Sequence, residues 1–207
     1  MFELSLSNDS SSGFLVKGNS RSFFDSSLHE NVTYSDDRIT INGIKYKDEK
    51  DVFFETGDYV IFTSGKIYYQ LSAFKQTRSL TAAEILDEYL KEKLDFINKI
   101  KGNFIILIYS KINSTFYILK DQLGLKYLYY KQAKDKFYIA TNLNDFKVGD
   151  FDINYSTILE KIIFNYPIST NTFIKDVYML DQGQIMERTN SVLTIRTYFK
   201  VEEFFSN

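Results

Sequence analysis

The 207-residue sequence contains no cysteine, no tryptophan, one proline and one histidine. Without cysteine the chain can form neither a disulfide framework nor a thiolate site for catalysis or metal binding. The single histidine, His29, offers no second imidazole for a His-rich metal cluster, and we expect no Ser-His relay. These absences exclude several common classes of catalytic site before any motif is considered.

Charge blocks and long apolar runs are also missing. The chain has 25 Lys and Arg residues against 27 Asp and Glu, a net charge of -2, and the two signs are interspersed. No basic patch is therefore expected to bind nucleic acid. The N-terminus lacks the pattern of a signal peptide, and no stretch approaches the roughly 18 apolar residues of a membrane span. We expect a cytoplasmic protein that binds neither nucleic acid nor membrane.

The composition that remains is sufficient for a substantial core. Hydrophobic residues make up 44% of the chain and aromatic residues 17%, which predicts a folded protein. No internal repeat, low-complexity tract or linker divides the sequence. We therefore predict a single domain over residues 1–207.

Apolar patterning predicts both strands and helices. Thr81 can cap a helix whose Glu84 reaches back, with apolar residues following at helical spacing. A second helix is expected after Asp152 or Asn154, either of which could cap it, because an apolar stripe recurs there at helical spacing: Tyr155, Ile158, Leu159, Ile162 and Ile163. The strands are expected at residues 14–16, 38–41, 59–62, 104–109, 116–119, 127–130 and 137–140, the last two as an antiparallel pair. This order predicts the α+β class, with helices packed on mainly antiparallel sheet.

Several segments in consistent order resemble the glutaminase domain of the asparagine synthetases. The segments are residues 102–104, 119–130 and 137–141, followed by the Leu-Asp-Gln-Gly run at 180–183, and the resemblance covers about residues 59 to 199. It implies an αββα sandwich of the N-terminal-nucleophile (Ntn) hydrolase type, with two mainly antiparallel sheets flanked by helices. Two departures are Lys120 in place of Arg and Tyr127 in place of Pro.

The residues at the catalytic positions of that family are replaced here. In working relatives, an N-terminal Cys attacks glutamine, and an Asn-Gly-Glu motif supplies the oxyanion hole and binds the substrate ammonium. Here Phe2 stands at the position of the Cys, and Ser64, Gly65 and Lys66 stand at the Asn-Gly-Glu motif. The resemblance therefore implies that no catalytic residue is present.

Two further positions of the glutamine pocket differ or match weakly. The family's Ser-Asp-x-Glu becomes Thr81-Ala82-Ala83-Glu84, so that Ala82 replaces an Asp that helps to hold the glutamine amino group. Arg38 is the only candidate for the arginine that binds the glutamine carboxylate, and a surface charge at a strand edge is the competing interpretation.

Asp121 and Gly124 are interpreted as structural residues of a turn. An Asp side chain accepts hydrogen bonds from backbone N–H groups two residues on, and Gly supplies a positive φ without steric cost. Direct contact with a ligand is the alternative.

The sequence therefore predicts a catalytically silent glutaminase-like domain. We expect it to act as scaffold or partner of an ATP-dependent amide-bond-forming synthetase, in cis or in trans, as in Cys-lacking relatives such as β-lactam synthetases and lasso-peptide cyclases. A second copy of this chain is the other partner that we consider, which would give a homo-oligomer. No cofactor is expected in this chain, since ATP and Mg belong to the synthetase domain that it lacks. The alternative is a stand-alone binding module with a remodelled pocket for another small molecule or peptide.

Overall fold

The computed structural model describes residues 2–7, 29–46, 51–69, 78–133, 136–146, 152–166, 168–189 and 192–204. The chain forms two compact units, each built from two separate segments. Unit 1 contains Met1–Lys47 and Tyr127–Leu180, and unit 2 contains Asp48–Lys126 and Asp181–Asn207. The predicted strand at residues 14–16 lies outside the described residues.

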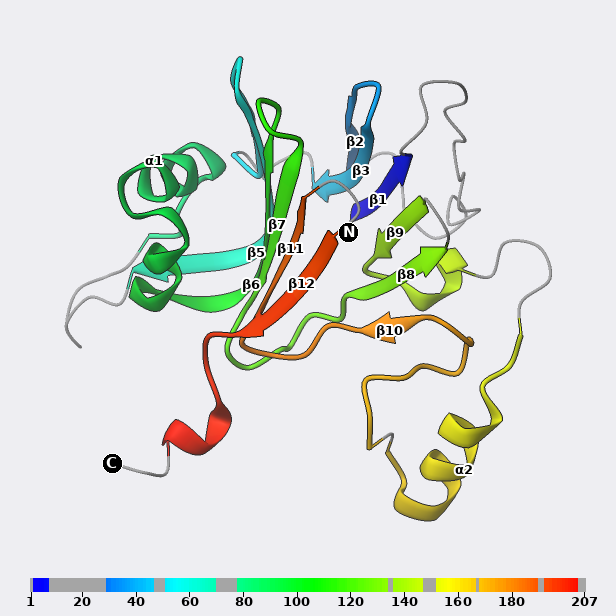
Figure 1. The fold of residues 1–207 in the computed structure, drawn as a ribbon. Coiled ribbons are helices and arrows are strands. Elements are labelled where there is room, and N and C mark those ends of the chain that lie inside the picture. Colours follow the sequence, from blue (N-terminus) through cyan, green and yellow to red (C-terminus); the bar gives the residue numbers. More distant parts are fainter. Residues whose placement is uncertain are drawn as a thin grey trace. The chain divides into compact units, whose positions relative to one another are not determined.

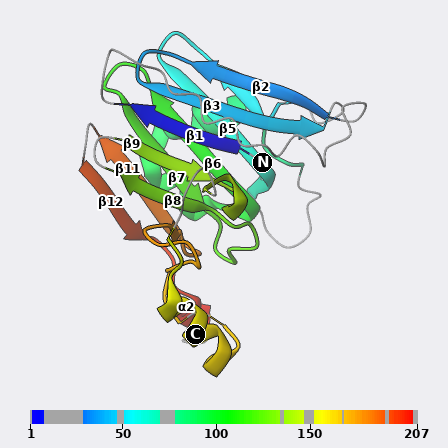
Figure 2. The same cartoon turned by 90° about the vertical axis from the view of Figure 1, so that its right-hand side faces the viewer.

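Unit 1 is a six-stranded sheet with the order β10-β8-β9-β1-β3-β2, and all of its pairings are antiparallel. Figure 2 shows β2, β3, β1, β9 and β8 side by side. The strands are β1 (Phe2–Ser7), β2 (His29–Ser35), β3 (Ile39–Tyr46), β8 (Tyr129–Ala133), β9 (Lys136–Ala140) and β10 (Tyr178–Met179). The predicted antiparallel pair is thus β8 with β9, although β8 begins two residues later than the pattern suggested.

Unit 2 is a second antiparallel six-stranded sheet, with the order β12-β11-β7-β6-β5-β4. Its strands are β4 (Phe53–Glu55), β5 (Tyr59–Tyr69), β6 (Ile100–Ser110), β7 (Thr115–Lys120), β11 (Gln184–Thr189) and β12 (Val192–Thr197). The continuous apolar run of β6 is buried from Phe104 to Ser110. A strand without polar alternation requires cover on both faces, and here every side chain in that run is buried.

Helix α1 (Ala82–Glu92) covers one face of the unit 2 sheet (Figure 1). Thr81 accepts a hydrogen bond from the Glu84 N–H, and the Glu84 carboxylate accepts from the Thr81 N–H, which completes the predicted capping box. Ile85 and Leu86 enter a core shared with Ile61 and Ile106 of the sheet. A 3₁₀ helix, η2 (Lys93–Lys99), connects α1 to β6.

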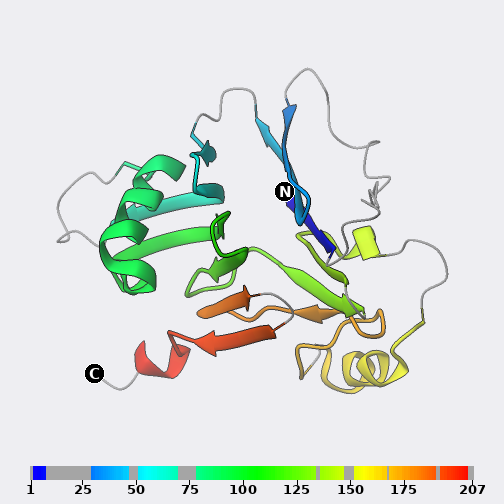
Figure 3. The ribbon, with the colours of Figure 1, turned by 45° about the horizontal axis from the view of Figure 1, so that its top comes forward.

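Helix α2 (Tyr155–Phe164) differs from its predicted packing. Asn154 caps it by accepting from the Thr157 N–H. Thr157 is its only buried residue, however, whereas Leu159 is 56% and Ile162 72% exposed. Figures 1 and 3 show α2 joined to β10 by a long coiled connection. The apolar stripe that predicted core packing therefore faces outward.

Two short 3₁₀ helices complete the described structure, η3 (Leu143–Phe146) in unit 1 and η4 (Val201–Phe204) in unit 2. The predicted α+β class with two mainly antiparallel sheets is confirmed. Among the described residues, no helix has the length and apolar character needed to cross a membrane.

Candidate functional site

Ser64, Gly65 and Lys66 lie on β5 where it pairs with the start of β6. Gly65 has a φ of 103°, and a Cβ atom on it would lie 2.0 Å from the carbonyl oxygen of Asn103. Across the pair, Gly102 has a φ of 141°, and its Cβ would lie 2.1 Å from the carbonyl oxygen of Lys66. The two glycines therefore allow the backbones of β5 and β6 to approach more closely than side chains would permit.

Lys66 and Asn103 are direct partners across these two strands. Ile67 and Phe104, the next residues on each strand, belong to the core beneath α1. Since neighbouring residues on a strand point to opposite faces, Lys66, Asn103 and Lys101 lie on the face away from α1. The Oδ1 atom of Asn103 is buried there without a hydrogen-bond partner.

Two lysines that sequence reasoning did not identify as site residues lie beside this pair. The Lys101 Nζ donates to Gln122 Oε1 over 2.6 Å and lies 5.8 Å from the centre of the Phe199 ring. Burial lowers the pKa of Lys101. The Cε atom of Lys126 is 2.7 Å from the position that a Cβ on Gly65 would occupy. The strand register could have indicated Lys101, but only the tertiary fold brings Lys126 to Gly65.

Asp121 forms the turn that follows β7. Its Oδ1 accepts from the Leu123 N–H at 2.8 Å and the Gly124 N–H at 2.6 Å, and its Oδ2 accepts from the Phe104 N–H at 3.3 Å. Gly124 has a φ of 64°. The carboxylate is fully buried and holds three backbone groups, a geometry that stabilises the turn and ties it to β6.

Lys120, the last residue of β7, is a buried cation with 2% of its surface exposed. Burial lowers its pKa, and the carboxylates of Asp121 and Asp181 partly oppose this shift. The negative charges of Asp121 and Asp181 thus act on the buried Lys120 ammonium group.

The start of α1 lies near the same end of β5. The Leu80 N–H donates to the carbonyl oxygen of Ile67 at 2.7 Å, and the Ala82 N–H donates to that of Asp51 at 2.8 Å. Ala82 itself is fully buried in the core beneath α1. Its methyl group adds apolar contact and offers no charge for a substrate amine.

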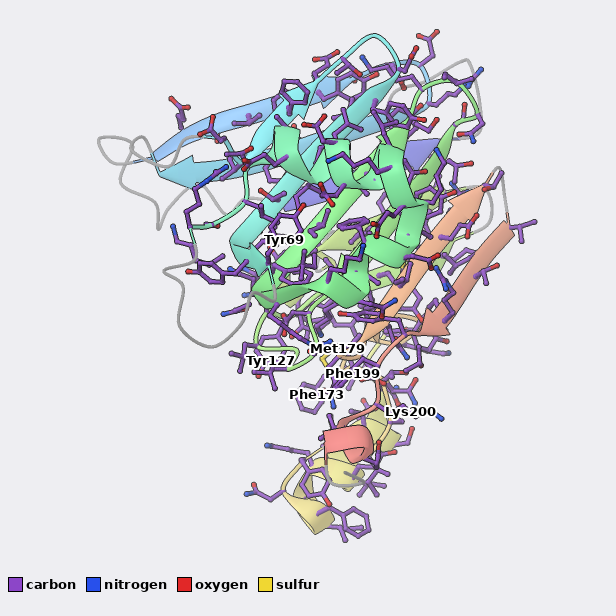
Figure 4. The ribbon with its side chains drawn as sticks, turned by 90° about the vertical axis from the view of Figure 1, so that its left-hand side faces the viewer. Tyr69, Tyr127, Phe173, Met179, Phe199 and Lys200 are labelled. Carbon is purple, nitrogen blue, oxygen red and sulfur yellow. The ribbon has the colours of Figure 1, made fainter. Side chains whose placement is uncertain are left out.

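Tyr68 and Tyr69, next along β5, point to opposite faces. Burial first, and then a hydrogen bond with Glu88 of α1, raise the pKa of Tyr69. Figure 4 shows Tyr69 beside α1. Tyr69 therefore belongs to the α1 face and not to the face that carries Lys66.

The remaining predicted positions, Arg38 and Phe2, belong to unit 1. Arg38 is exposed just before β3, and its backbone N–H donates to Asp36 Oδ1 at 2.8 Å. Phe2 begins β1 and is paired with Gly43 of β3. The fold thus brings Ser64, Gly65 and Lys66 to the start of α1 within unit 2.

The chemistry available at these residues is electrostatic. Lys66, Lys101 and Lys126 supply positive charge, and Ser64, two residues before Lys66, is a half-buried hydroxyl residue. His29, the one imidazole in the sequence, begins β2 in unit 1. No group of three His, Cys, Asp or Glu suited to a metal ion occurs among the described residues.

Comparison with known proteins agrees with the resemblance seen in the sequence. The profile of the glutamine amidotransferase domain family matches residues 21–199. Asparagine synthetase [glutamine-hydrolyzing] 1 of Bacillus subtilis (strain 168) is 26% identical over 159 compared positions, and the match covers 71% of this chain and 25% of that protein. The chain thus matches about a quarter of the length of this relative. The predicted resemblance is confirmed at this level, and membership of a Cys-lacking subgroup stays a prediction.

Two solved structures are also similar. Glutamine phosphoribosylpyrophosphate amidotransferase from B. subtilis, complexed with ADP and GMP, is 12% identical with a TM-score of 0.45, covering 78% of this chain and 35% of that one. A structure described as the allosteric regulatory enzyme of purine biosynthesis is 9% identical with a TM-score of 0.48, covering 96% of this chain and 43% of that one.

Proposed function

The chain belongs to the glutamine amidotransferase domain family, and from this premise we propose that it is a catalytically silent member. In this proposal it serves as scaffold or partner of an ATP-dependent amide-bond-forming synthetase. The observation that carries the proposal is the complete absence of cysteine from the sequence. Thiolate attack is the step that the working relatives named above require.

The residues around the lost nucleophile support the same conclusion. Lys66 is an exposed cation where the resemblance implies a carboxylate that binds the substrate ammonium. Ala82 is buried in the α1 core where it implies a second carboxylate. Burying an ammonium without a compensating charge is costly, so both changes disfavour glutamine. The nucleophile and both amine-binding carboxylates are replaced together. Three such changes in one pocket support a changed role more strongly than the loss of the nucleophile alone would.

The outward face of α2 supports the association. Leu159, Ile162 and Ile163 are 56%, 72% and 68% exposed on consecutive turns of one short helix. The two charged side chains of α2 bind backbone nearby, since Lys161 Nζ donates to the carbonyl oxygen of Asn165 and Glu160 Oε2 accepts from the Ile168 N–H. Apolar side chains thus dominate this face, which suits an apolar surface of a synthetase partner. The curated relative, named as a synthetase, is about four times as long as the matched segment.

Catalytic silence is tested by measuring ammonia release from glutamine, with labelling by an electrophilic glutamine analogue as a second readout. We expect neither. The Phe2→Cys variant should remain inactive, because Ser64, Lys66 and Ala82 still lack the groups that bind glutamine. Saturable glutaminase activity in the unmodified chain would refute the proposal, and activity in Phe2→Cys alone would show that the pocket has been misinterpreted.

The partner is tested by co-expressing the chain with synthetases encoded beside its gene, followed by size-exclusion chromatography with light scattering. We expect co-elution with an ATP-binding synthetase, weakened by Ile162→Ser. Burial of one such side chain contributes about 1.5–3 kcal/mol, so the Kd should rise at least roughly tenfold. Ile112→Ser, in the turn between β6 and β7, is a matched control because Ile112 is 70% exposed. A strictly monomeric chain, or equal effects of the two variants, would contradict the scaffold role.

A stand-alone binding module is the second candidate function. The observation that favours it is Lys66, an exposed cation that stands where the resemblance implies a carboxylate for the substrate ammonium. Binding of a small molecule at Lys66 in the absence of any synthetase partner would favour the module.

A further inference from the structure

β12 is an outer strand of the unit 2 sheet, and β11 is the only strand with which it pairs (Figure 2). In an antiparallel sheet, alternate residues of a strand direct their backbone N–H and C=O groups to opposite sides. About half of these groups in β12 therefore point away from β11. Among the described residues, no backbone hydrogen bond joins β12 to an element other than β11. An unpaired edge of this kind can add a further strand.

The sequence of β12 distinguishes it from the other outer strands of the two sheets. β4 has three residues and β10 has two, whereas β2 contains Glu, Asn and Ser, which are poor strand formers or polar. β12 reads Val-Leu-Thr-Ile-Arg-Thr, with four β-branched residues, one charge and neither Pro nor Gly. Its register with β11 is unbroken over all six residues, so no bulge protects the edge. Segments with this composition are the ones that pair with copies of themselves.

We propose that two copies of this chain associate by antiparallel pairing of their β12 strands about a two-fold axis at Thr194. Residues directly opposite each other on neighbouring strands point to the same face of a sheet. In this arrangement Thr194 faces Thr194 of the second copy, and Leu193 faces Ile195 of the second copy. The two unit 2 sheets then form one continuous sheet.

The side chains of β12 are complementary to themselves in this register. Leu193 and Ile195 are half-buried and lie on the face away from α1, so that their pairing joins two apolar residues across the axis. Val192 is 68% exposed, and it would be covered by the aliphatic part of Arg196 from the second copy. Each opposed pair therefore joins apolar groups or two threonines. This self-complementarity favours a second copy over an unrelated extended segment.

The charge of Arg196 selects the position of the axis. With the axis at Thr194, the two Arg196 residues are four positions apart along the strands, a separation of about 14 Å. An axis at Ile195 would make them diagonal neighbours at about 7–8 Å, where like charges repel. An axis at Leu193 would pair only three residues of each strand. The register at Thr194 thus gives five paired residues without a close pair of like charges.

The assembly closes at two copies, because a two-fold pairing uses the single β12 edge of each chain. The far edge of the same sheet is β4, whose three residues offer little for a further strand. This inference concerns unit 2 and does not depend on the synthetase partner, for which the supporting surface is α2.

Disulfide cross-linking tests the register, since the original chain has no cysteine and an introduced thiol can pair only with its own copy. Thr194→Cys should give a covalent dimer after mild oxidation, because opposed Cβ atoms about 4.5–5.5 Å apart lie close to disulfide geometry. Val192→Cys is the matched control: it is exposed on the same face of β12 but lies four positions from its own copy. Non-reducing electrophoresis gives the readout. No cross-link in Thr194→Cys, or equal cross-linking of both variants, would overturn the proposal.

Size-exclusion chromatography with light scattering over a range of concentrations tests the association itself. We expect a dimer of the original chain. Thr194→Arg and Thr194→Glu should each raise the Kd of the dimer more than roughly tenfold, because like charges then meet at the axis. An equimolar mixture of the two variants should restore the dimer, which a folding defect in either one would not allow. A monomeric original chain, species larger than a dimer, or no recovery in the mixture would refute the pairing.

Discussion

The Tyr198 hydroxyl donates a hydrogen bond to the carbonyl oxygen of Lys120 at 2.8 Å. Tyr198 follows β12, and Lys120 ends β7, so the bond joins parts of unit 2 that are 78 residues apart in the chain. The Tyr198 N–H also donates to the carbonyl oxygen of Gly183 at 2.8 Å. Burial raises the pKa of the Tyr198 hydroxyl, which keeps it protonated as a donor.

Tyr198→Phe should lower the free energy of unfolding by about 1 kcal/mol, because the ring is kept and only one hydrogen bond is lost. Urea denaturation monitored by circular dichroism measures the change. Tyr155→Phe is the control, since Tyr155 is 70% exposed on α2, and it should have little effect. Equal losses in the two variants would show that the Tyr198 bond adds no stability.

Gly65→Ala should destabilise the protein by at least about 2 kcal/mol, because it adds strain at a positive φ and places a Cβ against the Asn103 carbonyl oxygen. The matched control is Gly57→Ala, where nothing lies within 4 Å of an added Cβ. Differential scanning calorimetry of both variants gives the comparison. A Gly65→Ala protein as stable as Gly57→Ala would mean that β5 and β6 relax freely at this point.

Glu84 should make stability depend on pH in the acid range. Hydrogen bonds from Arg78 and then from Thr81 lower the pKa of Glu84 to about 2. Its stabilising effect is therefore complete above the usual pKa of about 4.3 and is lost as the pH falls towards 2. The side chain is 30% exposed, and solvent screening limits the effect to about 1 kcal/mol.

The Glu84→Gln variant tests this pH dependence. Gln can still complete the capping box but cannot pair with Arg78. The difference in unfolding free energy between the original chain and this variant should shrink as the pH falls from 5 to 2. A difference that stays constant over that range would contradict the assigned pKa shift.

Lys120 should make stability rise with pH in the alkaline range, as Glu84 does in the acid range. Because its pKa is lowered in the folded state, the unfolded chain binds more protons between that pKa and the usual value near 10.4. Stability contributed through Lys120 therefore rises with pH in this window. The Lys120→Met variant should lack this rise, which urea titrations of both proteins at matched pH would show. Identical pH profiles would indicate that Lys120 is well solvated.

Local patterns in the sequence were sufficient where each residue's neighbours in the chain decide the structure. The capping box of Thr81 and Glu84 and six of the twelve described strands follow from spacing alone, and the cap of α2 is one of the two residues that the sequence offered, Asn154. The α+β class could be predicted for the same reason, since the alternation of strand and helix periods fixes which layers can form. The absence of cysteine needs no structure at all, and it excludes a thiolate nucleophile within the chain.

Only the tertiary structure decided the features that depend on residues far apart in the chain. The stripe on α2 has the spacing of a buried face, yet Leu159 and Ile162 face outward, because periodicity identifies an apolar face without stating what covers it. Ala82 matched a pocket position but is buried in the core beneath α1. Lys126 reaches Gly65 through a turn that Asp121 holds against β6. Strand register and turn geometry bring such groups together, and neither can be read from residue types one position at a time.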